Sequence, residues 1–114
     1  MKKEVIPCVE ACLACYTACL DCANEGIKMA REEMINCIQA CLDCAELCNL
    51  CARFSATDSD YLRKVCTLCA DLCYTCAAEC DKHDEEHCRI CAEACRTCAL
   101  ECEVMVEVEE AFLN

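Results

Sequence analysis

The sequence has few of the residues that interrupt helices or build turn-rich folds. Its 114 residues include one glycine, one proline and no tryptophan, and only 4% are aromatic. Scarce glycine and proline disfavour a β fold, which needs frequent turns. No run of about 18 uncharged apolar residues predicts a membrane span. The N-terminal segment MKKEVIPCVEAC has neither an apolar signal core nor twin arginines. We therefore expect a cytoplasmic, helical protein.

Basic residues are also scarce. Ten Lys and Arg against 22 Asp and Glu give a formal net charge of −12. This balance excludes nucleic acids and anionic membranes as expected partners, because both attract basic patches. A solvated acidic surface explains most of the negative charge. The same charge mildly favours the approach of cations.

Cysteine is the residue in excess, with 20 copies. Such a fraction usually indicates a small disulfide scaffold, but thiols stay reduced in the cytoplasm, where a cysteine pattern more often indicates metal binding or catalysis. The cysteines form four groups of five, two spaced 4, 3, 4, 3 and two spaced 3, 4, 3, 4. The groups are Cys8, Cys12, Cys15, Cys19 and Cys22; Cys37, Cys41, Cys44, Cys48 and Cys51; Cys66, Cys69, Cys73, Cys76 and Cys80; and Cys88, Cys91, Cys95, Cys98 and Cys102.

Alternating steps of three and four place each group on one face of a helix. The pattern predicts helices over 6–25, 29–53, 60–81 and 84–108, with 103–114 as an extension of the last. Short connections make neighbouring helices antiparallel. The sequence therefore predicts an all-α, up-down-up-down four-helix bundle with a cysteine-lined core, in one domain over 1–114.

Helix ends are predicted from single residues. Pro7 suits the first turn of the first helix, and Gly26 suits a left-handed end of that helix. A residue of 58–60 should cap the third helix, and the acidic residues 84–86 should begin the fourth. Apolar residues outside the cysteine faces, such as Leu13, Leu20, Leu68 and Tyr74, predict a homo-oligomer surface.

The twenty thiols allow three interpretations: core packing, disulfides and metal binding. A core of twenty small, equal side chains packs poorly compared with Leu or Ile. Disulfides within a helix would be strained, because Cβ atoms three or four residues apart lie about 5–6 Å from each other and a disulfide needs about 3.5–4.5 Å. Disulfides between helices are possible, but they do not require a thiol at every layer. Metal binding fits best, because an unbroken ladder of C-x-x-C and C-x-x-x-C steps runs along all four helices.

Thiolates select Cu(I), Zn(II) or iron–sulfur clusters. Five tetrathiolate zinc centres would bury about ten negative charges, which is very costly. One Cu(I) per cysteine replaces one proton per thiol and leaves the charge unchanged. Iron–sulfur clusters usually take ligands from loop-like runs. The pattern therefore favours storage of many Cu(I) ions, near one per cysteine.

The two ends of this core should differ. Continuing the cysteine faces leads to Met34 and His83 at one end, with Met29 and His87 nearby. Thioether and imidazole bind Cu(I) more weakly than thiolate, so we expect copper to enter at this end. Alternative roles as core filling for the methionines and as solvated turn residues for the histidines remain open. The opposite end should be an apolar plug, formed by Val5, Leu62, Met105, Phe54 and Phe112.

Two other functions remain as alternatives: zinc or cadmium sequestration, and thiol–disulfide redox chemistry. A redox protein needs a singled-out, exposed thiol of low pKa, which a uniform ladder does not offer. The sequence has no Ser/His/Asp set, phosphate loop or paired catalytic carboxylates, so we expect no enzyme activity.

The segment VCTLCADLCYTCAAECDKHDEEHCRICAEACRTCALEC, residues 65–102, resembles the cysteine-rich four-helix-bundle copper storage proteins, cytosolic branch. The resemblance covers nearly the whole chain. It implies that the cysteines bind Cu(I), that His83 and His87 lie at the entrance, and that the chain forms a homotetramer. A copper chaperone or a low-molecular-weight thiol would then be the copper donor. The chain departs from the family in its five cysteines over 37–51, where relatives are expected to carry Arg, Asp and Ala at some positions, and in its longer tail.

Overall fold

Four long helices make up most of the chain in the computed structural model, which describes the backbone of residues 1–113 and the side chains of residues 1–111. The helices are α1 (Ile6–Met29), α2 (Ile35–Ala56), α3 (Leu62–Cys80) and α4 (Glu86–Leu113). Single-turn 3-10 helices, η1 (Lys3–Val5) and η2 (Glu32–Met34), lead into α1 and α2. Regular structure within residues 1–113 is entirely helical, which confirms the all-α prediction.

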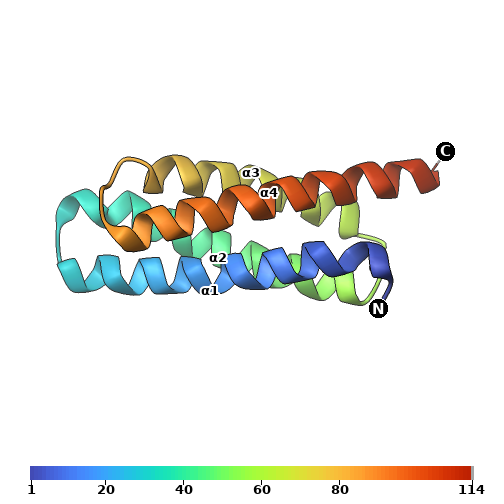
Figure 1. Ribbon diagram of the computed structural model, residues 1–114, viewed down its shortest axis with the longest axis horizontal. Helices are drawn as coiled ribbons and strands as arrows, with labels where there is room; N and C mark the ends of the chain where they lie inside the picture. Colours follow the sequence, from blue (N-terminus) through green and yellow to red (C-terminus); the bar gives the residue numbers. More distant parts are fainter. Residues whose placement is uncertain (114) are drawn as a thin grey trace.

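The helices form the predicted antiparallel bundle. Each helix packs against the next, and α1 also packs against α4, in a rod of 48 × 20 × 18 Å. The α1–α2 and α3–α4 connections lie together at one end, and the N-terminus and the α2–α3 connection lie at the other (Figure 1). The four cysteine faces can therefore share one interior along the whole rod.

The predicted starts of the helices are confirmed in part. Pro7 lies in the first turn of α1. In the turn before α3, Ser59 Oγ accepts a hydrogen bond from the Tyr61 N–H at 3.1 Å, but Tyr61 is the N-cap and makes no side-chain cap bond. The N-cap of α3 therefore lies one residue after the range 58–60, and the predicted cap is wrong. Of the acidic residues 84–86, only Glu86 belongs to the first turn of α4.

The predicted end of the first helix at Gly26 is wrong. Helix α1 continues to Met29, and Ala30 takes the left-handed conformation, with φ 54° and ψ 39°. Gly26 is buried inside the helix, where an added Cβ would lie 2.9 Å from Ile38 Cγ1 of α2. This glycine therefore serves the close approach of two helices rather than a turn.

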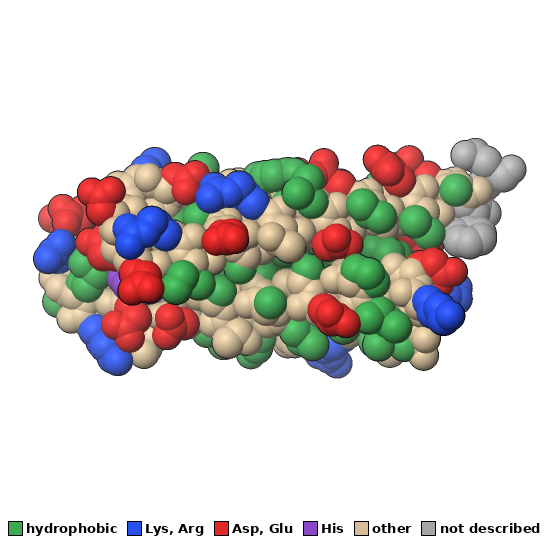
Figure 2. Space-filling model, viewed as in Figure 1, with side chains coloured by type: hydrophobic (Ala, Val, Ile, Leu, Met, Phe, Trp, Pro, Cys, Tyr) green, Lys and Arg blue, Asp and Glu red, His purple; other side chains and the backbone are tan. Residues whose placement is uncertain are grey.

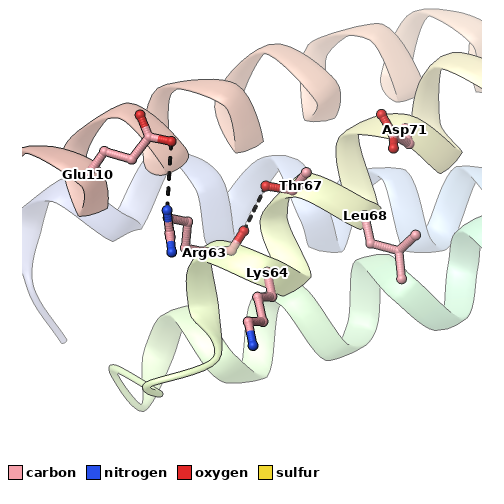
Figure 3. A pocket seen from close by; sticks show the side chains of 6 residues that line it. All are labelled: Arg63, Lys64, Thr67, Leu68, Asp71 and Glu110. Carbon is pink, nitrogen blue, oxygen red and sulfur yellow. Dashed lines mark hydrogen bonds and ion pairs between the residues drawn. The ribbon is translucent and has the colours of Figure 1, made fainter. Parts of the chain in front are cut away.

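The C-terminal segment extends α4 as predicted and projects past the other helices (Figure 1). Arg63 Nη1 at the start of α3 lies 3.9 Å from Glu110 Oε1 in this extension. The pair borders a surface hollow of about 300 Å³ between the two helices (Figure 3). An ion pair thus connects the extension of α4 to α3 beyond Cys102.

Among the described residues, the stretch Lys3–Met29 is long and apolar enough to cross a membrane by length and composition alone. Its five cysteines supply much of that apolar character, and all of them are buried against the other helices. Its cysteine face thus lies in the core, and 39% of its apolar window is buried inside the bundle.

Candidate metal centre

All twenty predicted cysteines line the interior of the bundle. Each is at most 1% exposed, and each carries a free thiol. Buried alanines flank the cysteine faces and keep the helices close, namely Ala23, Ala45, Ala52, Ala70, Ala77, Ala92 and Ala99. The 3,4 spacing therefore places every cysteine as the sequence predicted.

Within one helix, the sulfurs that approach each other belong to C-x-x-x-C steps. Their Sγ–Sγ distances are 3.8–4.0 Å, in the pairs Cys8–Cys12, Cys15–Cys19, Cys44–Cys48, Cys69–Cys73 and Cys91–Cys95. The sequence did not distinguish these steps from the C-x-x-C steps. The difference arises because the direction of each side chain, as well as its spacing, decides which sulfurs meet.

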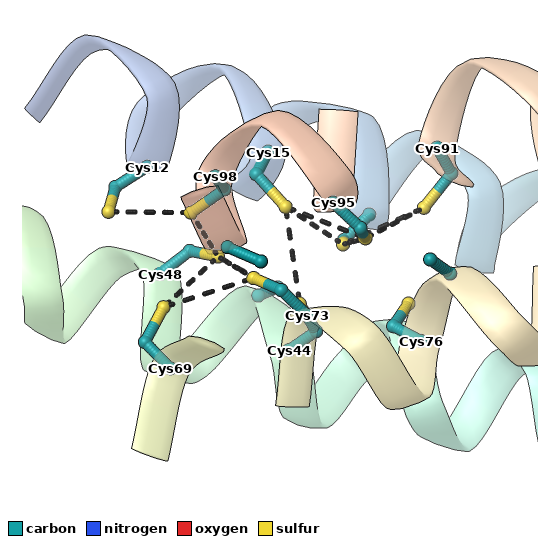
Figure 4. Packing of buried hydrophobic residues seen from close by; sticks show 14 of the residues in the cluster. Cys12, Cys15, Cys44, Cys48, Cys69, Cys73, Cys76, Cys91, Cys95 and Cys98 are labelled. Carbon is teal, nitrogen blue, oxygen red and sulfur yellow. Dashed lines mark hydrogen bonds between the residues drawn. The ribbon is translucent and has the colours of Figure 1, made fainter. Parts of the chain in front are cut away.

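Contacts between helices are as short as those within a helix. Between α2 and α3, the Sγ atoms of Cys51 and Cys66 lie 3.4 Å apart. Between α1 and α4, those of Cys15 and Cys95 lie 3.6 Å apart. Across the diagonal from α2 to α4, Cys48 contacts Cys98 at 3.8 Å. Figure 4 shows the sulfurs from all four helices turned toward one another along the axis.

These contacts assemble sets of four sulfurs in which all members lie within 4.8 Å of one another. Copper bound between two thiolates needs sulfurs about 4–5 Å apart, if its bonds resemble those of zinc to sulfur. The thiols therefore fit Cu(I) with small movements. The sets include Cys8/Cys51/Cys66/Cys102, Cys12/Cys51/Cys69/Cys102, Cys15/Cys48/Cys73/Cys98, Cys15/Cys19/Cys44/Cys95 and Cys19/Cys76/Cys91/Cys95.

The protonation of the thiols depends on their neighbours. The neighbouring thiols of Cys19 and Cys41 lower the pKa of Cys76 to about 7. At the end with the two short connections, burial raises the pKa of Cys88 to about 12. The thiol of Cys76 in the middle of the core is therefore easier to deprotonate than the thiol of Cys88, whose burial favours the protonated form.

The four non-cysteine residues predicted at the entrance lie at the end that holds the α1–α2 and α3–α4 connections. Met34 is fully buried, and Met29 packs half-buried against the core. His83 and His87 are half-buried, and His87 Nδ1 lies 3.6 Å from Cys88 Sγ. Thioether and imidazole groups that could bind copper thus lie at this end of the thiol column, and His87 contacts the column directly.

The opposite end is closed by apolar side chains, as predicted. Val5, Leu62 and Met105 are at most 3% exposed, and Phe54 is half-buried against the core. The side chain of Phe112, also predicted here, lies outside the described residues. Sequence reasoning missed Ser55, which is 1% exposed and has the only buried side-chain N or O atom without a hydrogen-bond partner among the described residues. Its position, four residues after Cys51, was the available signal.

The fold and the sulfur clusters define a metal-binding helical bundle with a thiol-lined interior. The family model for copper storage protein (Csp) matches residues 1–107, and the chain belongs to this family. This confirms the resemblance inferred from the sequence.

Relatives support the assignment. The chain is 38% identical to the Cu(I)-bound copper storage protein BsCsp3, of Bacillus subtilis, with a TM-score of 0.88 over 91% of this chain and 99% of that one. It is 34% identical to a copper-loaded cytosolic copper storage protein from Streptomyces lividans, with a TM-score of 0.85 over 92% and 93% of the two chains. It is also 40% identical to the uncharacterized cysteine-rich protein YhjQ of Bacillus subtilis strain 168, over 76% of this chain and 82% of that one.

Proposed function

We propose that this chain stores Cu(I) in the interior of its bundle, with the twenty cysteine thiolates as ligands and a capacity near one copper per cysteine. The observation that carries the proposal is the column of sulfurs through the bundle, in which contacts of 3.4–4.0 Å run along and between the helices. Such a column offers bridging positions throughout its length rather than one isolated centre.

Charge balance supports copper over zinc as the stored ion. Each Cu(I) displaces one thiol proton, so a full core carries no more charge than an empty one. A column filled with tetrathiolate zinc would bury about ten uncompensated negative charges. Soft thiolate ligands also match Cu(I). The copper-bound relatives named above extend this argument to the family.

Copper enters, in this proposal, at the end that carries Met34, His83 and His87. A surface hollow of about 390 Å³ adjoins His87 and is lined by the carboxylates of Asp21, Glu25 and Glu86. Negative charge beside the column favours the approach of a cation. Met29, at the end of α1, adds a second thioether on this side.

We also propose a setting for this storage role. The protein acts in the cytoplasm as a homo-oligomer, a tetramer by family resemblance, and it receives copper from a chaperone or a low-molecular-weight thiol. It performs no catalysis in this proposal, since all twenty thiols are buried and none is singled out as an exposed nucleophile.

Anaerobic titration of the reduced protein with Cu(I), against a chromophoric chelator, tests the proposal. We expect uptake of about twenty equivalents per chain with retained helical circular dichroism. Zn(II) in a parallel titration should saturate at no more than about five equivalents, because each zinc requires four thiolates. Saturation with only a few Cu(I) would contradict the proposal, and zinc binding that outcompetes Cu(I) would favour zinc sequestration instead.

A further inference from the structure

The inward face of α2 continues one step past its last cysteine. Steps of 4, 3, 4, 3 lead from Cys37 to Cys51, and a further step of four reaches Ser55. Its side chain is 1% exposed, and its Oγ has no hydrogen-bond partner. Ser55 therefore occupies a core position at the closed end of the bundle.

The other helices fill the corresponding positions with apolar groups. Val5 precedes Cys8 by three residues, Leu62 precedes Cys66 by four, and Met105 follows Cys102 by three. These three side chains are at most 3% exposed and need no hydrogen bond. They cover the end of the sulfur column together with Ser55. A hydroxyl in this layer is an exception that destabilises the metal-free protein, because a buried donor without a partner loses its bonds to water.

The usual local partner of such a hydroxyl is not used. A serine or threonine in a helix commonly donates to the carbonyl four residues earlier. Thr17 does so with Leu13 O at 3.0 Å, and Thr67 with Arg63 O at 2.9 Å. For Ser55 this partner would be the Cys51 carbonyl, and no such bond forms. The hydroxyl therefore remains available to another acceptor in the core.

The last sulfur cluster, Cys8, Cys51, Cys66 and Cys102, offers candidate acceptors at this end of the bundle, and its sulfurs all lie within 4.8 Å of one another. Cys51 is one helical turn from Ser55 on the same face. A thiol sulfur is a weak acceptor. A thiolate is a far better one, because hydrogen bonds to ionised acceptors are roughly twice as strong as neutral ones.

We propose that Ser55 is a positioning residue for copper at the closed end: its hydroxyl donates a hydrogen bond to a thiolate of this four-cysteine cluster once Cu(I) has replaced the thiol protons. The inference rests on the proposed copper storage. The displaced protons leave to solvent, while Ser55 keeps its own proton and donates it only as a hydrogen bond. The Ser55 hydroxyl, which has no partner in the metal-free protein, thereby gains one when copper binds. Copper at this end is held more tightly as a result.

Ser55→Ala tests the inference, with Ser55→Thr as the variant that keeps a hydroxyl. Thr67→Ala is the matched control, because it removes an exposed hydroxyl from a helix near the same end of the bundle. Each protein is titrated anaerobically with Cu(I) against a chelator, and each metal-free form is unfolded by heat. We expect Ser55→Ala to retain its total capacity but to bind a subset of coppers about tenfold more weakly. Its metal-free form should be at least as stable as the parent, and Ser55→Thr and Thr67→Ala should bind copper like the parent.

Three outcomes would overturn the role of Ser55. One is a Ser55→Ala binding curve identical to that of the parent. Another is an equal weakening of all coppers together with a less stable metal-free form, which would indicate general damage to packing. The third is failure of Ser55→Thr to restore binding. Each of these three outcomes is informative only if the unsubstituted protein takes up about twenty Cu(I) ions. A parent that binds only a few would overturn the proposed storage function itself.

Discussion

Gly26 shows how one missing side chain sets the distance between two helices. An added Cβ at this position would lie 2.9 Å from Ile38 Cγ1 and 3.4 Å from its Cδ1. Because Cγ1 is held close to the α2 backbone, it cannot swing aside as freely as the end of a longer side chain. The contact lies near Met34, whose Cε would be 3.8 Å from the same added Cβ. Any displacement here reaches the end of the bundle through which we propose that copper enters.

Gly26→Ala should therefore destabilise the metal-free protein by about 1 kcal/mol. Overpacking in a core costs roughly 1–3 kcal/mol, and the better helix propensity of alanine returns up to about 1 kcal/mol. Thermal unfolding followed by circular dichroism measures the net effect. The same change in an Ile38→Ala background, where the clash is absent, should stabilise the protein relative to Ile38→Ala alone. Destabilisation of equal size in both backgrounds would show that the contact with Ile38 is not the cause.

The inward orientation of single residues was largely predictable from the sequence. The alternation of three and four is a property of each helix alone, and it correctly placed the faces of all twenty cysteines. Which sulfurs meet was not predictable, because that depends on side-chain direction and on the stagger of the helices. The contact of Cys51 with Cys66 at 3.4 Å is one example. The role of Ser55 was not predictable either, because a single serine carries little signal unless its burial is known.

At the scale of the helices, the presence and order of the four helices were predictable from the sequence. The residues at which several of them begin or end were not. The order and number of helices follow from four periodic segments with short connections. The predicted end of α1 is wrong because Gly26 satisfies the local rule for a left-handed cap. Packing against α2 requires the same residue inside the helix. Ala30 took the left-handed position instead. Tertiary contact thus prevailed over a local preference.

The two ends of the bundle each carry a buried methionine, which allows a direct comparison between them. Met34 is fully buried at the end with the histidines, and Met105 is 1% exposed at the closed end. Replacing Met34 with Leu, together with His83→Ala and His87→Ala, should slow Cu(I) loading severalfold and leave the capacity unchanged. The reason is that these side chains offer weaker ligands through which copper can pass to the thiolates. Stopped-flow transfer from a chelator measures the rate.

Met105→Leu is the matched control for this experiment, since it removes a buried thioether of the same size from the other end. It should leave the loading rate unchanged. If Met105→Leu slowed loading as much as the triple variant, copper would have no preferred end. If neither variant changed the rate, the proposed role of the histidines and Met34 would be wrong.

The whole molecule presents apolar side chains outward as well as thiols inward. Figure 2 shows apolar side chains between acidic ones along one face of the rod. On α1, Leu13, Leu20 and Ile27 are 46%, 39% and 58% exposed and recur every seven residues. A repeat of seven keeps them on one side of the helix. Such a stripe, on a chain with a net charge of −12, is typical of a surface that another chain covers.

Assembly and storage should therefore be separable, because the proposed oligomer would use outward residues whereas the proposed copper sites use inward ones. Leu13→Glu combined with Leu20→Glu should convert the oligomer to monomers, measured by size-exclusion chromatography with light scattering. Copper capacity per chain should stay unchanged, since the thiols are enclosed by the four helices of a single chain. Lys64→Glu, at an exposed site on α3, lowers the net charge by the same amount and should leave the assembly intact. An oligomer that persists with both leucines replaced would place the interface elsewhere on the bundle. A fall in capacity in step with dissociation would mean that the interior of one chain is not a complete store.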